Sequence, residues 1–138
     1  TMSFGDYAWN EPYARCVEKG DQTAIADLEA SYLKAAEQSL TYSRGLSATL
    51  YGKDIPYVLL MHLGAFDARM APRLLALYQS LGVTLVTLHE AEKDPFYAAD
   101  LNATASPAPT TLENVMTARG LAVPKPTWDL APLDALCR

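Results

Sequence analysis

The feature that most constrains this chain is an apolar stretch at residues 57–64, which reads Tyr-Val-Leu-Leu-Met-His-Leu-Gly and follows Pro56. Apolar runs without polar alternation are typical of strands covered on both faces, as in parallel sheets. The pattern therefore predicts a buried strand that ends at His62. Active sites of such folds gather beyond the carboxyl ends of the strands, so His62 is a candidate catalytic residue. The competing interpretation is a core histidine, which is the more frequent role of a lone histidine on an apolar strand.

Helical periodicity flanks this strand. Apolar residues recur at three- and four-residue intervals through residues 21–51, and Asp21 is a candidate cap. A second helix is expected after Asp67, with a regular part that starts a few residues late because of Pro72. Residues 83–88 are rich in β-branched side chains and predict a second strand. Strand, helix and strand joined by short links form a parallel βαβ unit, so the sequence predicts an α/β fold.

The second histidine of the chain follows this second strand. In a parallel βαβ unit both strands end at the same edge, so His89 is expected on the same rim as His62. His89 and Glu90 begin the HExxH pattern of zinc proteases, but Lys93 stands where the second histidine would be. A surface capping position at the start of a short helix, residues 89–92, is the better account of His89.

Composition excludes several classes of partner. The 138 residues are half hydrophobic and carry a net charge of −5, without a cluster of lysine and arginine. Such a chain is large enough for a core and is poorly suited to a nucleic-acid backbone. No apolar run approaches the roughly 20 residues that a membrane-spanning helix needs. The two cysteines, Cys16 and Cys137, lack the spacing of a zinc site; two separate buried thiols are expected, although they could pair if the chain ends meet.

A second candidate group follows the strand-like residues 1–4. Asp6 is flanked by Tyr7 and Trp9 in a stretch punctuated by glycine and proline, as loops are. A carboxylate at the end of a strand is well placed to orient a histidine, and the aromatic rings could line a pocket of sugar size. The alternative is that Asp6 caps a helix while the aromatic side chains fill the core. The spacing leaves both interpretations open.

The last third of the chain differs in composition. Residues 102–111 form a linker of low complexity, and a helix is expected at residues 112–119. The sequence thus divides into residues 1–104 and a tail, residues 105–138, that packs on the first part. Its apolar side chains look like the anchors of that packing: Trp128, Leu130, Leu133 and Leu136.

Two separated motifs carry a resemblance to a known family. Ser-Phe-Gly-Asp-Tyr at residues 3–7 resembles the fourth motif of NodB-type polysaccharide deacetylases, carbohydrate esterase family 4, and Leu-Leu-Met-His at residues 59–62 resembles their fifth. Residues 60–97 look like the closing section of bacterial members. The similarity covers roughly residues 1–100, which would make this chain the carboxyl-terminal part of the catalytic domain.

The resemblance implies a distorted (β/α) barrel of which this chain supplies the late strands and helices. It implies a hydrolase that removes N-acetyl groups from amino-sugar polysaccharides with the help of a divalent metal such as zinc. His62 matches the general acid and Asp6 the carboxylate that tunes it, while Tyr7 and Leu60 are expected to line the substrate pocket. The metal ligands and the general base match no residue here, so they are expected on the missing amino-terminal half of the barrel, as a separate or missing chain.

Further expectations follow from this assignment. The chain alone is expected to be inactive, the substrate is an N-acetylated oligosaccharide or polysaccharide, and a periplasmic or secreted location is favoured. Within enzymes, a related hydrolase of small-molecule amides is the alternative. From another class, a non-catalytic helical interaction domain remains open, in which Asp6 and His62 are structural.

Overall fold

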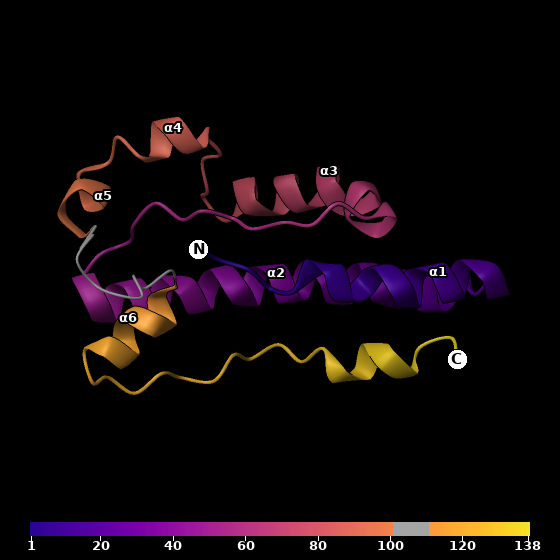
Figure 1. The fold of residues 1–138 in the computed structure, drawn as a ribbon. Helices are drawn as coiled ribbons and strands as arrows, with labels where there is room; N and C mark the ends of the chain where they lie inside the picture. Colours follow the sequence, from indigo (N-terminus) through magenta and orange to yellow (C-terminus); the bar gives the residue numbers. More distant parts are fainter. Residues whose placement is uncertain (101–110) are drawn as a thin grey trace.

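The computed structural model describes residues 1–100 and 111–138 (Figure 1). Nearly all of the predicted linker, residues 102–110, lies outside the described residues. The helices follow one another as η1 (Asp6–Trp9), α1 (Asn10–Lys19), α2 (Gln22–Tyr51), α3 (Ala65–Ser80), α4 (Leu88–Ala91), α5 (Pro95–Asp100), α6 (Leu112–Ala118) and η2 (Ala131–Ala135), where η denotes a short 3-10 helix.

The long helix α2 confirms the prediction from periodicity. The Asp21 side chain accepts a hydrogen bond from the N–H of Ala24 at 2.9 Å, which caps the first turn as expected. The helix passes through Gly45 without interruption and ends at Gly52, whose φ of 68° is readily adopted only by glycine. Helix α2 is the element against which the other helices pack, because one of its faces is buried along most of its length. The residues of this face include Ile25, Leu28, Tyr32, Ala36, Leu40, Ser43 and Leu46.

Helix α3 starts earlier than expected, at Ala65, and continues through Pro72. A proline inside a helix costs about 3 kcal/mol because it removes a hydrogen bond and its ring crowds the preceding turn. Burial of apolar side chains on both sides of the proline offsets this cost: Phe66 and Met70 lie before it and Leu74 and Tyr78 after it, all at most 3% exposed. The packing of one continuous face therefore overrides the local signal. Helix α6 confirms the helix predicted at residues 112–119.

Helix α1 was not predicted, because its first residues look like a loop. Pro12 lies in its first turn, where a proline needs no hydrogen-bond partner, and Gly20 follows its end with a φ of 67°. A proline near the start of a segment and a glycine just after its end together indicate a helix between them. Helix α1 packs on both α2 and α3, and the three helices form the main body of the molecule (Figure 1).

The predicted α/β fold is wrong. The structure is helical and, within the described residues, its β pairing is one isolated parallel bridge between Met2 and Leu59. Met2 donates to the Val58 carbonyl at 2.8 Å, and Leu60 donates to the Met2 carbonyl at 2.9 Å. Residues 83–88, the second expected strand, do not join this bridge. Sheets need three or more strands to be stable on their own, and two short extended segments do not meet that requirement.

The core at the centre of the helices is rich in aromatic side chains. Phe4, Trp9 and Phe66 surround Tyr32 edge to face, with ring centroids 4.9–5.5 Å from that of Tyr32. Such edge contacts are favourable beyond the area they bury. A smaller apolar cluster lies near the carboxyl end of α2 and packs α6 against that helix. Its buried members are Leu46, Ile55, Leu112 and Met116. None of the described helices is long and apolar enough to cross a membrane.

The carboxyl-terminal tail packs along the body as predicted. Leu133 is buried, and Trp128, Leu130 and Leu136 are partly buried against the main core. Arg15 of α1 donates to the Leu136 carbonyl at 3.1 Å. The expectation of two separate thiols is wrong, since Cys16 and Cys137 form a disulfide. The tail brings the two cysteines together because its anchors lead the chain back to α1, a path that spacing alone does not reveal.

Candidate functional site

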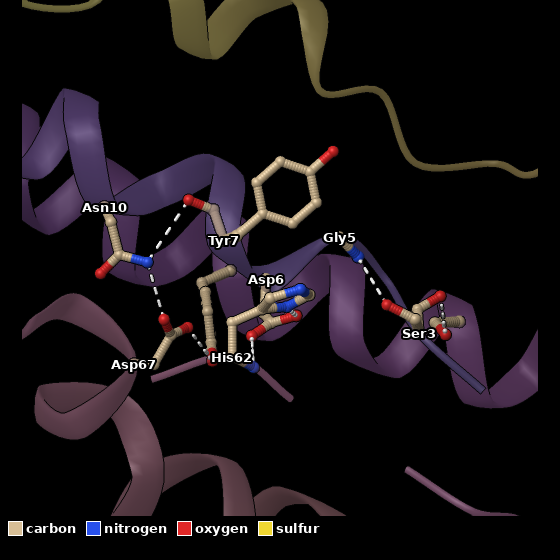
Figure 2. A network of polar contacts seen from close by, with 9 residues as sticks. Ser3, Gly5, Asp6, Tyr7, Asn10, His62 and Asp67 are labelled. Carbon is tan, nitrogen blue, oxygen red and sulfur yellow. Dashed lines mark hydrogen bonds and ion pairs between the residues drawn. The ribbon is translucent and has the colours of Figure 1, made fainter. Parts of the chain in front are cut away.

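The Asp6 and His62 side chains form the contact that the sequence predicts. Asp6 Oδ1 lies 3.0 Å from His62 Nδ1, and Asp6 Oδ2 accepts a hydrogen bond from the His62 backbone N–H at 2.6 Å (Figure 2). The carboxylate is fully buried, whereas the histidine side chain is 47% exposed. One carboxylate therefore fixes both the backbone and the ring of His62. Its other ring nitrogen, Nε2, has no hydrogen-bond partner among the described residues.

Local backbone features deliver the two residues to one place. The bridge between Met2 and Leu59 sets the register of two segments that leave it side by side, one toward Asp6 and the other toward His62. Gly5 then turns the chain with a φ of 75°. A Cβ at Gly5 would lie 2.9 Å from the end of the Leu130 side chain, which could move aside, so the positive φ of the turn is what requires glycine there. The contact thus depends on a short bridge, not on the edge of a sheet.

An open pocket of about 650 Å³ lies beside His62. The Tyr7 ring forms one side of it, edge-on to the imidazole with ring centroids 5.1 Å apart, and the Tyr7 side chain is exposed. The other predicted pocket residue, Leu60, is half-exposed and does not belong to this lining. Residues of η1, of α1, of the segment before α3 and of the first position of α3 line the pocket, and they are a mixture of polar, aromatic and apolar residues: Tyr7, Asn10, Tyr13, Ala14, Val17, His62, Leu63, Gly64 and Ala65.

Sequence reasoning missed a second polar group beside the pocket. Asp67, expected to cap α3, is buried and accepts hydrogen bonds from the Tyr32 hydroxyl at 3.0 Å and from Asn10 Nδ2 at 2.7 Å. Burial raises the pKa of the Tyr32 hydroxyl, and the neighbouring Asp67 carboxylate raises it further, so Tyr32 stays protonated and donates. The sequence did offer one signal for this group: Tyr32 carries a hydroxyl within the buried stripe of a long helix and therefore needs a hydrogen-bond partner. Its partner, Asp67, lies 35 residues away and could not be identified from the sequence.

His89 does not share a rim with His62. It lies in the exposed helix α4, which follows the carboxyl end of α3, whereas His62 precedes the amino end of α3 (Figure 1). Helix α3, with 16 residues and a length of about 24 Å at 1.5 Å per residue, lies between the two histidines in the chain. The predicted capping role is also misplaced, because Thr87 accepts the hydrogen bond from the N–H of Glu90.

The residues that the structure describes do not provide a metal site. No group of three or more histidine, cysteine, aspartate or glutamate side chains is arranged to hold an ion among them. Asp6 and His62 bind one another, and both cysteines are consumed by the disulfide. A metal ion does not fit the donors that the described residues offer.

No family model, curated protein or solved structure matches this chain. The functional assignment consequently rests on the geometry of the site and on the motif resemblance at residues 3–7 and 59–62.

Proposed function

We propose that this chain supplies the general acid of an amide hydrolase that removes acetyl groups from N-acetylated amino sugars. One observation carries the proposal: a half-exposed imidazole is held through Nδ1 by a fully buried carboxylate, beside an open pocket. A histidine with a purely structural role is normally buried with both nitrogens satisfied. Here the contact with Asp6 orients the half-exposed ring through Nδ1 and does not engage Nε2, the nitrogen proposed to transfer the proton.

The proposed role of His62 is confined to the second half of the hydrolysis. Water adds to the acetamide carbonyl, and the resulting tetrahedral intermediate collapses with cleavage of the C–N bond. The amine cannot leave as an anion, so Nε2–H of the charged imidazole donates its proton to the departing nitrogen. Acetate and the free amine are the products. The negative Asp6 compensates the charge of the imidazolium before this step and keeps Nδ1–H pointing at the carboxylate.

The pocket suits a sugar better than a flat apolar ligand. Tyr7 and Tyr13 offer aromatic faces and phenol groups beside His62, and Ala14, Val17 and Leu63 add apolar surface. Concave sites with a few polar groups among apolar ones are typical of small-molecule binding. The motif resemblance adds the class of substrate, an N-acetylated oligosaccharide or polysaccharide.

The proposal assigns the general base and the metal ligands to a second polypeptide segment, since the described residues offer neither. The chain is then inactive alone. The disulfide between Cys16 and Cys137 supports a periplasmic or secreted location, because disulfides persist mainly in oxidising compartments.

A second candidate is a non-catalytic helical interaction domain. The helical fold, with a core of its own around Tyr32, favours this alternative. It does not account for the half-exposed ring on a buried carboxylate, because an interaction surface does not need an oriented imidazole. A hydrolase of small-molecule amides would use the same pair and would differ only in substrate.

Acetate release from N-acetylated chito-oligosaccharide tests the proposal. The chain is combined with a polypeptide that carries the metal ligands and the general base, and turnover is compared for the unmodified protein and for His62→Ala and His89→Ala. Loss of turnover in His62→Ala alone supports the assignment. Equal turnover in the two variants, or no acetate release from the unmodified combination, rejects it.

A further inference from the structure

Asn10 lines the pocket beside His62, yet both of its amide hydrogens and its carbonyl oxygen are engaged inside the protein. Its Oδ1 accepts from the Phe66 backbone N–H at 3.0 Å. Its Nδ2 donates to Asp67 Oδ2 at 2.7 Å and to the Tyr7 carbonyl at 3.3 Å (Figure 2). An asparagine amide has two donor hydrogens and one carbonyl oxygen. Asn10 therefore has no free donor for a substrate, and its function must be sought in what it holds.

What Asn10 holds is the loop that carries His62. Phe66 is the second residue of α3, four positions after His62, and Tyr7 is the residue whose ring packs on the imidazole. Gly64 lies directly against the amide, since a Cβ built there would be 2.1 Å from Asn10 Oδ1. The loop between His62 and α3 is thus pressed against one side chain of α1.

Asp67 fixes this side chain in turn. The carboxylate is 5% exposed and bridges Asn10 of α1 to the Tyr32 hydroxyl of α2, while it belongs to α3 itself. Three helices therefore converge on one buried carboxylate, and its partner amide contacts the loop. The orientation of the amide is also defined, because a flipped Asn10 would place its carbonyl against the carboxylate.

We propose that Asn10, held by Asp67, is a positioning residue that sets the place of the His62 loop. Asp6 orients the imidazole from one side, and Asn10 fixes the backbone that follows it from the other. The kinetic part of this inference rests on the proposed deacetylase function, whereas its structural part does not. A shift of about 1 Å in a reacting group costs on the order of 100-fold in rate, so the loop position matters to catalysis.

An exchange of the two side chains provides the test. Asn10→Asp sets two carboxylates against each other at the 2.7 Å contact, which forces them apart. Asp67→Asn in the same molecule restores a carboxylate facing an amide: Asp at position 10 still accepts from the Phe66 N–H, and Asn at position 67 still accepts from Tyr32. The single variant should therefore displace the loop, and the double variant should return it.

Glu29→Gln is the matched control. Glu29 of α2 binds Arg69 and Arg73 of α3 at 2.7 and 2.5 Å, so it links two helices of the body without contacting the His62 loop. Loss of this link lowers the thermal stability of the fold without moving His62. The comparison separates a positioning role from a general loss of stability.

Two readouts decide the matter. In the 138-residue chain, hydrogen exchange of the His62 amide, which donates to Asp6, should be faster in Asn10→Asp, slow again in the double variant and unchanged in Glu29→Gln. In the combined enzyme, Asn10→Asp should lower kcat about 100-fold with little change in KM, and the double variant should recover most of that loss.

The inference is overturned if His62 amide exchange in Asn10→Asp equals that of the unmodified chain, or if the double variant recovers neither exchange nor kcat. If the unmodified enzyme releases no acetate, the proposed function fails on its own, and the exchange measurements still decide whether Asn10 positions the loop.

Discussion

The two histidines of this chain begin from similar sequence contexts and end in opposite environments. Each follows a segment rich in apolar residues, and a helix begins close to each: α3 starts three residues after His62, and α4 starts one residue before His89. The segment before His62 pairs with Met2, and the ring then meets the buried Asp6. The apolar side chains of the segment before His89 are not buried: Leu85, Val86 and Leu88 are each about half exposed. The comparison teaches that a carboxylate partner and a packed surrounding, not the local pattern, make a histidine a candidate for chemistry.

The helices around the two histidines also differ. At the His62 end, the helices α1, α2 and α3 meet through the hydrogen bonds of Asp67, and the disulfide ties the tail to α1. At the His89 end, α4 is a single exposed turn that follows α3. Precise placement of a reacting group requires a rigid support, which only the His62 end provides.

The largest expected effect is that of His62→Ala on turnover. If His62 is the general acid, as proposed, its loss should lower deacetylation by about 10²–10⁴, the usual size of such a contribution. Acetate release at saturating N-acetylated chito-oligosaccharide measures it, and the thermal midpoint serves as the control for folding. Turnover within twofold of the unmodified enzyme would contradict the contrast between the two histidines.

Removal of the disulfide tests the support at the His62 end. Cys16→Ala with Cys137→Ala should lower the free energy of unfolding by about 4 kcal/mol, because the bond closes a loop of more than one hundred residues in the unfolded chain. Chemical denaturation with and without a reductant measures this, and the reductant should have no effect on the double variant. Hydrogen exchange should accelerate more in α1 than in α4; a uniform change would show that the two ends are not supported differently.

Asp6→Asn should lower turnover less than His62→Ala does, and should lower the free energy of unfolding less than removal of the disulfide does. An asparagine oxygen can accept from the His62 backbone N–H, but its amide group then faces Nδ1, which can accept from it only without its own proton. The contact between a carboxylate and Nδ1–H is lost, which costs about 1–3 kcal/mol of stability. Turnover should fall, but by less than in His62→Ala, because the acid itself remains. Denaturation and acetate release measure the two quantities. A turnover loss as large as that of His62→Ala would show that Asp6 does more than hold the ring.

His89→Ala is expected to have the smallest effect. The residue lies in an exposed turn, and substitutions at such positions usually change stability by less than about 0.5 kcal/mol. Turnover and the thermal midpoint should match those of the unmodified protein. A loss of turnover comparable to that of His62→Ala would remove the distinction between the two sites.

Much of the helical structure was predictable from the sequence. The stripe from Ile25 to Leu46 and the cap at Asp21 are local signals, and α2 follows them closely. The contact between Asp6 and His62 was predictable as well, from two separated motifs. These predictions succeed because each depends on near neighbours in sequence or on one bridge between two short segments.

Other features were not predictable because they depend on distant partners. Residues 83–88 have the composition of a strand, but a strand exists only where another pairs with it. The disulfide joins cysteines 121 residues apart and requires the path of the whole tail. Asn10 and Asp67 carry no pattern at all, since their hydrogen bond spans 57 residues and becomes visible only when α1 and α3 pack.

The imidazole nitrogen spectrum of the 138-residue chain tests the central claim most directly, because it needs no partner and no substrate. In a nitrogen-15 spectrum at neutral pH, His62 should show a proton fixed on Nδ1 that exchanges slowly with water, since the buried Asp6 accepts it. The signal of His89 is identified as the one that disappears in His89→Ala, and the ring protons of His89 should exchange rapidly with water. If the Nδ1 protons of His62 and His89 exchange equally fast, the Asp6–His62 pair does not exist in solution and the proposed acid is lost with it.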